Sequence, residues 1–399
     1  MISSSPRLRH GLAAVLLGLA CSLAARAQSA DQIRVLARDP DGHGLLCEHG
    51  GKQILMLAGT PEQMGTAHGR LLKPAVRGVA NGTMYLVGAG YSVAKGDWFF
   101  DRMADVIRRT QPHTPERFIR ECDAMSRAAG ISERDGRTAN FFPELFHCSG
   151  VAVRNGATAD GMLLHARVLD YMKEINLQKY AVIQLWMPDG RQAWLSLGYA
   201  GFVGTVTCMN EKGLAIGEMG GRGEGQWDGE PMNFLLRDLM ERAGTVREAL
   251  AILAKTPRTC EYYYVLSDRT RDMVAVHATP DQLEILEAGQ QHPQLPPVPA
   301  DTVYVSAGNR AKALSERLHA AHGRIDVQTM IEMLKRPVAM SSNLHNAIFR
   351  PETLDMWCAD ASRNAVACDQ PYVRVNLADL MKFYRTPPPA APGAPAPTP

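Results

Sequence analysis

Apolar residues recur at three- and four-residue intervals along the first third of the chain, which is the spacing of one helix face. The clearest stretch carries apolar side chains at Met64, Leu71, Leu72, Ala75, Val76 and Val79. We expect residues 61–130 to be mostly helical. A lead-in over residues 28–58 contains short apolar runs, such as residues 53–57, that predict strands.

From residue 148 onward, short apolar runs bounded by Gly- and Asp-rich turns predict strands, interrupted by a few helical stretches. Thr245 stands where it would cap one of those helices. Runs of helices and antiparallel hairpins predict packed layers of helix and sheet, an α+β fold. The expected strands are residues 180–187, 192–197, 205–209, 214–219, 261–267, 273–278, 283–286, 347–349 and 356–358, and the expected helices are residues 233–242, 246–254, 312–321 and 327–335.

A thiol begins the first strand after the helical part. Cys148 opens that strand, and Arg167 and Asp170 stand near the end of the next. A hairpin centred near Thr158 would place position 148 opposite position 168. The guanidinium would then favour the thiolate. Arg167 and Asp170 are three apart, so they share a site only if Asp170 lies at a bend or past the strand's end. The alternative is a buried cysteine beside a surface ion pair.

The composition of the chain and its two terminal segments limit the classes of protein to consider. A hydrophobic content of 46% predicts an ordinary globular core, and a net charge of +2 gives no argument for a nucleic-acid partner. A basic start, a short apolar stretch over residues 11–20 and an Ala-x-Ala site ending at Ala27 predict a signal peptide over residues 1–27, and therefore an exported, periplasmic or secreted protein. The apolar stretch is too short for a stable membrane span. The Pro- and Ala-rich residues 387–399 predict a disordered tail.

Seven cysteines remain once the leader is removed. An odd number in an oxidising compartment indicates one free thiol and up to three disulfides. Cys358 and Cys368 are close enough in sequence to pair, and Cys148 is the natural free thiol. The alternative is that several of the seven are reduced and buried.

Six short segments, in a specific order over most of the mature chain, carry a resemblance to a known family. They are residues 57–69, Cys148-Ser149-Gly150, residues 167–171, residues 209–215, residues 264–268 and Gly308-Asn309. With these segments the chain resembles the acyl-coenzyme A:isopenicillin N acyltransferase family. It is more distantly similar to choloylglycine hydrolases and acid ceramidases, all of them N-terminal-nucleophile hydrolases. The resemblance implies a four-layer αββα sandwich of two antiparallel sheets between helical layers.

The resemblance also implies self-cleavage between His147 and Cys148, which would yield a light chain of residues 28–147 and a heavy chain of residues 148–386. The thiol attacks the preceding carbonyl, and water then releases a new amino terminus. Cys148 would carry a thiol and a free α-amine with a pKa of roughly 8, which can take the thiol proton. One residue then supplies both nucleophile and base.

Other site residues follow from the same resemblance. Asp170 would orient the new α-amine, and Arg167 would keep the surroundings of the thiol positive. Asn309 matches the side-chain amide that the family directs at the tetrahedral oxyanion, and one such donor is typically worth about 10²–10³ in rate. A backbone N–H near Gly220 would be the second donor. No cofactor or metal is implied, because the sequence holds no His-Glu-x-x-His zinc motif.

Three positions depart from the family pattern, which commonly has Gly before the cysteine, Thr after it and His after the Asn. This chain has His147, Ser149 and Arg310 there. The leading hypothesis is an exported amidase or acyltransferase that acts on a small-molecule, non-peptide amide, either an N-acyl amine or an N-acyl amino acid. One alternative is a phospholipase B-like esterase, because thioester chemistry also accepts esters. The other is a non-catalytic periplasmic binding protein that has kept the fold and lost self-cleavage. His147, which stands where the family commonly has Gly before the nucleophile, is the feature that supports this alternative.

Overall fold

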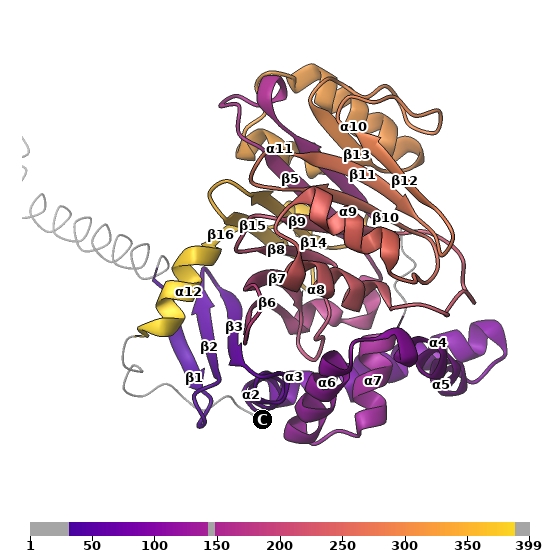
Figure 1. The fold of residues 1–399 in the computed structure, drawn as a ribbon, viewed down its shortest axis with the longest axis vertical. Helices are drawn as coiled ribbons and strands as arrows, with labels where there is room; N and C mark the ends of the chain where they lie inside the picture. Colours follow the sequence, from indigo (N-terminus) through magenta and orange to yellow (C-terminus); the bar gives the residue numbers. More distant parts are fainter. Residues whose placement is uncertain (1–31, 143–147, 388–399) are drawn as a thin grey trace, which may run out of the picture.

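Two β-sheets lie face to face between layers of helices in the computed structural model, which describes residues 32–142 and 148–387 (Figure 1). The larger sheet has ten strands in the order β1-β2-β3-β6-β7-β8-β9-β10-β11-β12, and the smaller has six in the order β13-β4-β5-β14-β15-β16. This arrangement confirms the predicted α+β sandwich. One ladder differs from an antiparallel sheet, because β3 and β6 run parallel. The helical segment and the first hairpin separate these two strands in sequence and supply the crossover that a parallel pair needs.

Each sheet combines strands from distant parts of the chain. The larger sheet contains β1 (Arg34–Arg38), β2 (Gly44–His49), β3 (Lys52–Gly59), β6 (Ala181–Pro188), β7 (Trp194–Tyr199), β8 (Thr207–Asn210), β9 (Ala215–Gly220), β10 (Tyr262–Ser267), β11 (Met273–Ala278) and β12 (Leu283–Glu287). The smaller sheet contains β13 (Thr302–Val305), β4 (Ser149–Val153), β5 (Leu164–Asp170), β14 (Asn343–Arg350), β15 (Asp355–Asp360) and β16 (Val373–Asn376).

Helices cover the outer faces of both sheets. The N-terminal group packs with the larger sheet and lies together at the bottom of Figure 1: α2 (Pro61–Leu71), α3 (Lys73–Gly78), α4 (Met84–Lys95), α5 (Phe99–Thr110), α6 (Glu116–Ala129) and α7 (Glu133–Phe141). The same sheet carries α8 (Met232–Arg242) and α9 (Val246–Lys255), while the smaller sheet carries α10 (Gly308–Ala321) and α11 (Val327–Leu334). The last helix, α12 (Leu377–Arg385), packs at the end of the sandwich between the sheets. Within residues 32–142 and 148–387, no helix is long and apolar enough to cross a membrane.

The predicted helical segment is confirmed, and Thr245 caps α9 by accepting a hydrogen bond from the Glu248 main-chain N–H. The prediction missed α7, α12 and the short strands β13 and β16. It also began the helix at residue 312 four residues too late, because α10 starts at Gly308. Asn309 therefore lies in the first turn of a helix. The expected signal peptide, residues 1–27, and residues 388–399 of the expected tail lie outside the described residues.

The hairpin that begins at Cys148 forms as predicted, but its register is one residue away from the expected one. Ser149 lies opposite Val168 and Gly150 lies opposite Arg167. The predicted pairing of positions 148 and 168 is therefore wrong, because the ten residues between Val153 and Leu164 place the centre of the turn after Thr158 rather than on it. As a result, Arg167 shares a sheet face with Gly150 and with Cys148, two residues earlier.

The predicted disulfide between Cys358 and Cys368 is wrong. All seven cysteines of the described residues are free and buried. Cys358, on β15, packs between the two sheets, whereas Cys368 packs with α10 and α11 on the outer face of the smaller sheet. Nearness in sequence gave no information on which face of the sheet each thiol occupies.

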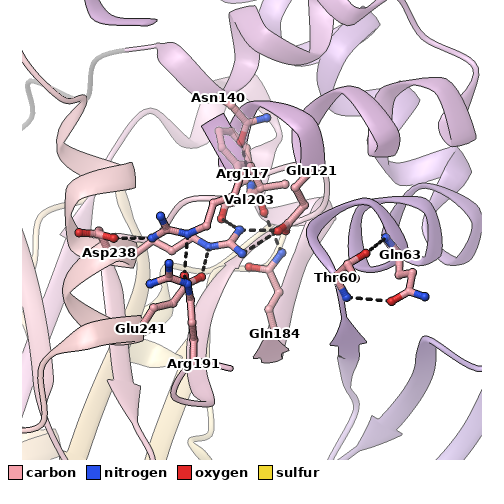
Figure 2. Close-up of polar contacts among 12 residues, drawn as sticks. Thr60, Gln63, Arg117, Glu121, Asn140, Gln184, Arg191, Val203, Asp238 and Glu241 are labelled. Atoms are coloured by element: carbon pink, nitrogen blue, oxygen red, sulfur yellow. Dashed lines mark hydrogen bonds and ion pairs between the residues drawn. The ribbon is translucent and has the colours of Figure 1, made fainter. Parts of the chain in front are cut away.

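A buried cluster of ion pairs joins the N-terminal helices to the rest of the chain (Figure 2). Arg237 on α8 donates two hydrogen bonds to the Glu121 carboxylate on α6, at 2.8 and 2.7 Å, and a third to Glu241 at 2.8 Å. Arg237 also donates to the carbonyl of Val203 at 2.6 Å. All three charged side chains are buried. The charges are therefore satisfied by one another and hold α6 against α8.

We predict that Glu121→Ala lowers the free energy of unfolding by about 3–5 kcal/mol, because it leaves the Arg237 charge without its bidentate partner. The shift in the urea unfolding midpoint measures the effect. Glu62→Ala is the matched control, since the Glu62–Arg120 pair at 3.2 Å is half exposed, and we expect it to change stability by less than about 1 kcal/mol. Equal, small effects for both variants would contradict a structural role for the buried pair.

Candidate active site

Cys148 lies at one end of a pocket between the sheets. The residue immediately precedes β4 and is 5% exposed. The pocket has a volume of about 490 Å³, which is within the usual size of small-molecule sites. Its walls come from the end of β9, from β10, β11 and β12, from the loop before β13 and from the segment that enters α10. Gly220, the expected neighbourhood of a second oxyanion donor, lines the same pocket as Cys148.

Arg167 is fully buried and contacts the thiol directly. Its Nη2 donates to the Sγ of Cys148 at 3.5 Å and to the Glu218 carboxylate at 3.1 Å. Its Nε donates to the main-chain carbonyl of Glu218 at 2.9 Å. Two contacts with one residue of the opposite sheet fix the guanidinium plane. The predicted neighbourhood of thiol and guanidinium is thus present in the structure.

His345 completes the surroundings of Arg167. Its Nε2 lies 3.0 Å from Arg167 Nη1, and its Nδ1 lies 3.1 Å from the hydroxyl of Tyr199. Burial, together with the Arg167 charge, holds the pKa of His345 well below its usual value, so the ring is neutral. A guanidinium only donates hydrogen bonds, so Nε2 is the acceptor and the ring proton sits on Nδ1. The imidazole therefore orients Arg167 without adding charge.

Opposing effects set the acidity of the thiol. The net effect raises the pKa of Cys148 to about 12: burial raises it most, the Glu218 and Asp170 carboxylates raise it further, and Arg167 and the main-chain N–H of Asp170 lower it. In the uncut chain the burial effect outweighs the guanidinium, so the thiol is protonated at neutral pH. A proton acceptor next to the sulfur is needed before it can attack.

Asp170 reaches Cys148 differently from the prediction. It is the last residue of β5 rather than a residue at a bend, and its carboxylate lies on the opposite face of the sheet from Arg167. Oδ2 accepts from Arg310 at 2.6 Å, and Oδ1 accepts from the main-chain N–H of Met340 at 2.9 Å. The Arg167 guanidinium and the Asp170 carboxylate therefore lie on opposite faces of the β4–β5 strand pair, next to which Cys148 stands.

Arg310 connects Asp170 to the residue after the nucleophile. The same Nη2 that binds Asp170 donates to the hydroxyl of Ser149 at 2.7 Å, and that hydroxyl lies 2.8 Å from the hydroxyl of Ser306. Burial raises the pKa of Asp170, and the Arg310 guanidinium counteracts this rise. Arg310 thus favours the charged form of Asp170 and contacts Ser149, the first residue of β4.

The structure does not bring Asn309 to this site. Its side chain is exposed at the start of α10, and it is absent from the residues that line the pocket, whereas its neighbours Gly308 and Arg310 are present. Asn309 lies in the first turn of α10, where it is exposed. The other half of the predicted cleavage site, His147, lies outside the described residues. Within the described ranges, no group of three or more His, Cys, Asp or Glu side chains has the arrangement of a metal site.

The sequence interpretation missed the roles of Glu218, His345 and Arg310. Glu218 carried a usable signal, because a single acid within the apolar strand Ala215–Gly220 suggests a buried partner of opposite charge. Arg310 was visible only as a departure from the family pattern. Nothing in the local sequence around His345 indicated a contact with Arg167.

Comparison with known proteins defines the class of this chain. The family model described as "Acyl-coenzyme A:6-aminopenicillanic acid acyl-transferase" matches residues 158–364, just over half of the 399 residues. The match includes Arg167, Asp170 and Arg310 and begins after Cys148. The chain belongs to this family. This confirms the resemblance and makes the protein an enzyme of the N-terminal-nucleophile hydrolase and acyltransferase class.

Several curated proteins and solved structures are similar to the chain. Protein dcd1A of Dictyostelium discoideum is 26% identical over 323 residues, which cover 70% of this chain and 72% of that protein. The N-acylethanolamine-hydrolyzing acid amidase of Mus musculus is 22% identical over 181 residues, 42% of this chain and 49% of that protein. The chain thus spans about half the length of that amidase. The structure of the Caenorhabditis elegans N-acylethanolamine-hydrolyzing acid amidase ortholog matches with a TM-score of 0.43 at 16% identity, covering 51% of this chain and 93% of that one.

We predict that Arg167→Met slows alkylation of Cys148 by iodoacetamide at pH 8, because loss of the guanidinium raises the pKa of the thiol further. Peptide mapping by mass spectrometry measures the rate at Cys148 separately from the rates at the other cysteines. Arg154→Met is the control: Arg154 lies on the same hairpin and is directed to Asp301 and the Arg271 carbonyl, so we expect no change in rate. Faster alkylation of Cys148 in the Arg167 variant would contradict the electrostatic role.

Proposed function

We propose that the protein is an exported cysteine amidohydrolase or acyltransferase that matures by cutting itself before Cys148 and then cleaves a non-peptide amide. The observation that carries the proposal is the contact between Arg167 Nη2 and Cys148 Sγ at 3.5 Å inside a pocket of about 490 Å³. A buried cysteine without a catalytic role needs neither the guanidinium nor the pocket. Export is included because of the basic start, apolar stretch and Ala-x-Ala site of residues 1–27.

Maturation begins with attack of the Cys148 sulfur on the carbonyl carbon of His147. The C–N bond between the two residues breaks, the nitrogen takes up the thiol proton, and a thioester joins His147 to the sulfur. Water then hydrolyses this thioester, which leaves a carboxylate on His147 and a free thiol and α-amine on Cys148. Ser149 and Arg310 fix the start of β4 during this step through their 2.7 Å contact.

The new α-amine is the proton acceptor that the buried thiol lacks. It takes the thiol proton, and the Arg167 charge stabilises the thiolate that forms. The thiolate attacks the substrate carbonyl, and a main-chain N–H near Gly220 receives the oxyanion. Gly220 supports this role because it lines the pocket. The α-ammonium returns its proton to the departing amine, and water or a second amine accepts the acyl group from sulfur. Asp170, held by Arg310, orients the ammonium.

The substrate class follows from chemistry and from the relatives. A thioester intermediate suits acyl transfer from an amide, and amidases that hydrolyse N-acylethanolamines are among the similar proteins. We therefore propose an N-acyl amine or N-acyl amino acid as substrate. Turnover of a panel of these amides against lysophospholipids separates this proposal from the esterase alternative.

Self-cleavage and activity are expected to depend on the same sulfur. Wild-type protein should separate into two fragments by intact mass, the larger one beginning with Cys148, and Cys148→Ala should stay uncut and lose activity by several orders of magnitude. Cys358→Ala is the matched control, because that thiol is buried between the sheets away from the pocket, and it should cut and react normally. Full amidase activity in an uncut chain would refute the mechanism.

The role of Asp170 gives a pH prediction with a defined sign. Burial raises the pKa of Asp170 and Arg310 opposes that rise, so Arg310→Met should raise the pKa further. Activity requires the carboxylate, so the acid limb of kcat/KM against pH should move to higher pH in Arg310→Met. Arg310→Lys keeps a positive charge and should restore most of the wild-type profile. An unchanged acid limb in Arg310→Met would show that Asp170 does not titrate in the reaction.

A further inference from the structure

The inner face of the larger sheet carries a row of polar side chains that starts beside the nucleophile. Met219 packs against Gly150, two residues after Cys148. Met219 lies opposite Tyr263 on β10, Tyr263 opposite His277 on β11, and His277 opposite Glu284 on β12. Residues directly opposite in antiparallel strands share a face. Beyond Met219, the polar row of Tyr263, His277 and Glu284 therefore runs across β10, β11 and β12 to the edge of the sheet.

Polar residues are unexpected at these positions, because inward-facing side chains of two packed sheets normally form an apolar core. The neighbouring inward positions follow that rule, with Val265 on β10, Ala275 on β11 and Leu286 on β12. The polar row coincides with the pocket, since Tyr263, His277 and Glu284 all line it. The polar side chains thus belong to the wall of the cavity that ends at Cys148.

Hydrogen bonds hold this polar wall in one arrangement. Glu261 accepts from the hydroxyl of Tyr263 at 2.6 Å and lies 3.0 Å from Nε2 of His277. The rings of Tyr263 and His277 stack with centroids 4.6 Å apart. On the outer side, Glu284 lies 3.6 Å from Nδ1 of His277 and 3.5 Å from Nε2 of His292.

The wall carries more acidic than basic charge. Burial alone would raise the pKa of Glu261, but the hydrogen bonds from Tyr263 and His277 outweigh it and lower the pKa below its usual value. Arg310, at the thiol end of the pocket, is engaged with Asp170. Besides Arg310, the Asp, Glu, Lys and Arg side chains that line the pocket are two carboxylates, Glu261 and Glu284, and one guanidinium, Arg222.

We infer that this wall selects substrates whose polar end is positively charged, such as N-acyl diamines and polyamines, over those whose polar end is a carboxylate, with Glu261 and Glu284 as the residues that discriminate. The inference rests on the proposed amidase function and narrows it. An N-acyl amino acid would bring a carboxylate toward two acids, whereas an ammonium group is attracted by both. Apolar lining residues such as Leu286 and Leu295 leave room for an acyl chain in the same cavity.

Three amides with one acyl chain and one spacer test the inference: N-dodecanoyl-1,4-diaminobutane, N-dodecanoyl-4-aminobutanol and N-dodecanoyl-4-aminobutanoate. We expect kcat/KM to fall in that order for the wild-type enzyme. Glu284→Gln should lower the ratio of kcat/KM for the cationic substrate to kcat/KM for the anionic one by roughly two- to fivefold. A partly exposed ion pair contributes up to about 1 kcal/mol, which corresponds to about a fivefold change. Glu284→Lys should lower it further, and high salt should reduce the wild-type preference.

The control is Glu316→Gln, which removes the same charge from an exposed position on α10 and should leave the substrate order unchanged. Turnover of all three amides at equal kcat/KM, or a preference for the carboxylate, overturns the inference and leaves the proposed function intact. If none of the three is turned over, the proposed amidase function fails, and calorimetric binding of the same compounds to the wild-type protein decides the inference. Tighter binding of the cationic amide than of the anionic amide then supports the inferred charge selection, and equal or weaker binding of the cationic amide overturns it.

Discussion

The buried guanidinium of Arg167 is the group on which the candidate active site depends. It comes from β5, reaches across to Glu218 of the opposite sheet, and places one nitrogen 3.5 Å from the Cys148 sulfur. A charge with no exposure is tolerated only when it is paired and its hydrogen bonds are satisfied. Glu218 and His345 meet that requirement from β9 and β14. Contacts between the two sheets therefore decide where the charge beside the thiol lies.

The strand pair β4–β5 gives Cys148 different surroundings on its two sides. The inner face of the smaller sheet carries Arg167, and the outer face carries Asp170 with Arg310. In the proposed mechanism, the inner charge acts on sulfur, while the outer carboxylate acts on the main-chain nitrogen of Cys148 that self-cleavage would free. This division explains why two residues three apart in a regular strand can serve one reacting residue. It also places the two salt bridges in separate environments, so each can be changed without breaking the other.

Local sequence was enough to predict the parts of this site that lie within one hairpin. The neighbourhood of Cys148 and Arg167 needed only two strands and a turn, although the register was one residue off because the loop has an even number of residues. Glu218, His345 and Arg310 come from 51, 178 and 140 residues away from their partners in the chain. Stacking of the two sheets brings in Glu218, pairing of β14 with β5 brings in His345, and packing of α10 on the smaller sheet brings in Arg310. Asn309 shows the converse error. The resemblance implied that its amide points at the oxyanion, but the side chain is exposed in the first turn of α10. The Cys358–Cys368 pairing failed for a similar reason, since closeness in sequence does not say on which face of a sheet a thiol lies.

The central claim is that the Cys148 sulfur, made nucleophilic by its own freed amine and by Arg167, carries the acyl group during turnover. The most direct test is an acid quench of the enzyme during the first turnover of a slow N-acyl amide, followed by mass spectrometry of its peptides. The account predicts a mass increase equal to the acyl group on the peptide that begins with Cys148, and its loss after treatment with hydroxylamine. An active enzyme that carries the acyl group on another residue, or none on Cys148 during a measured burst, would contradict it.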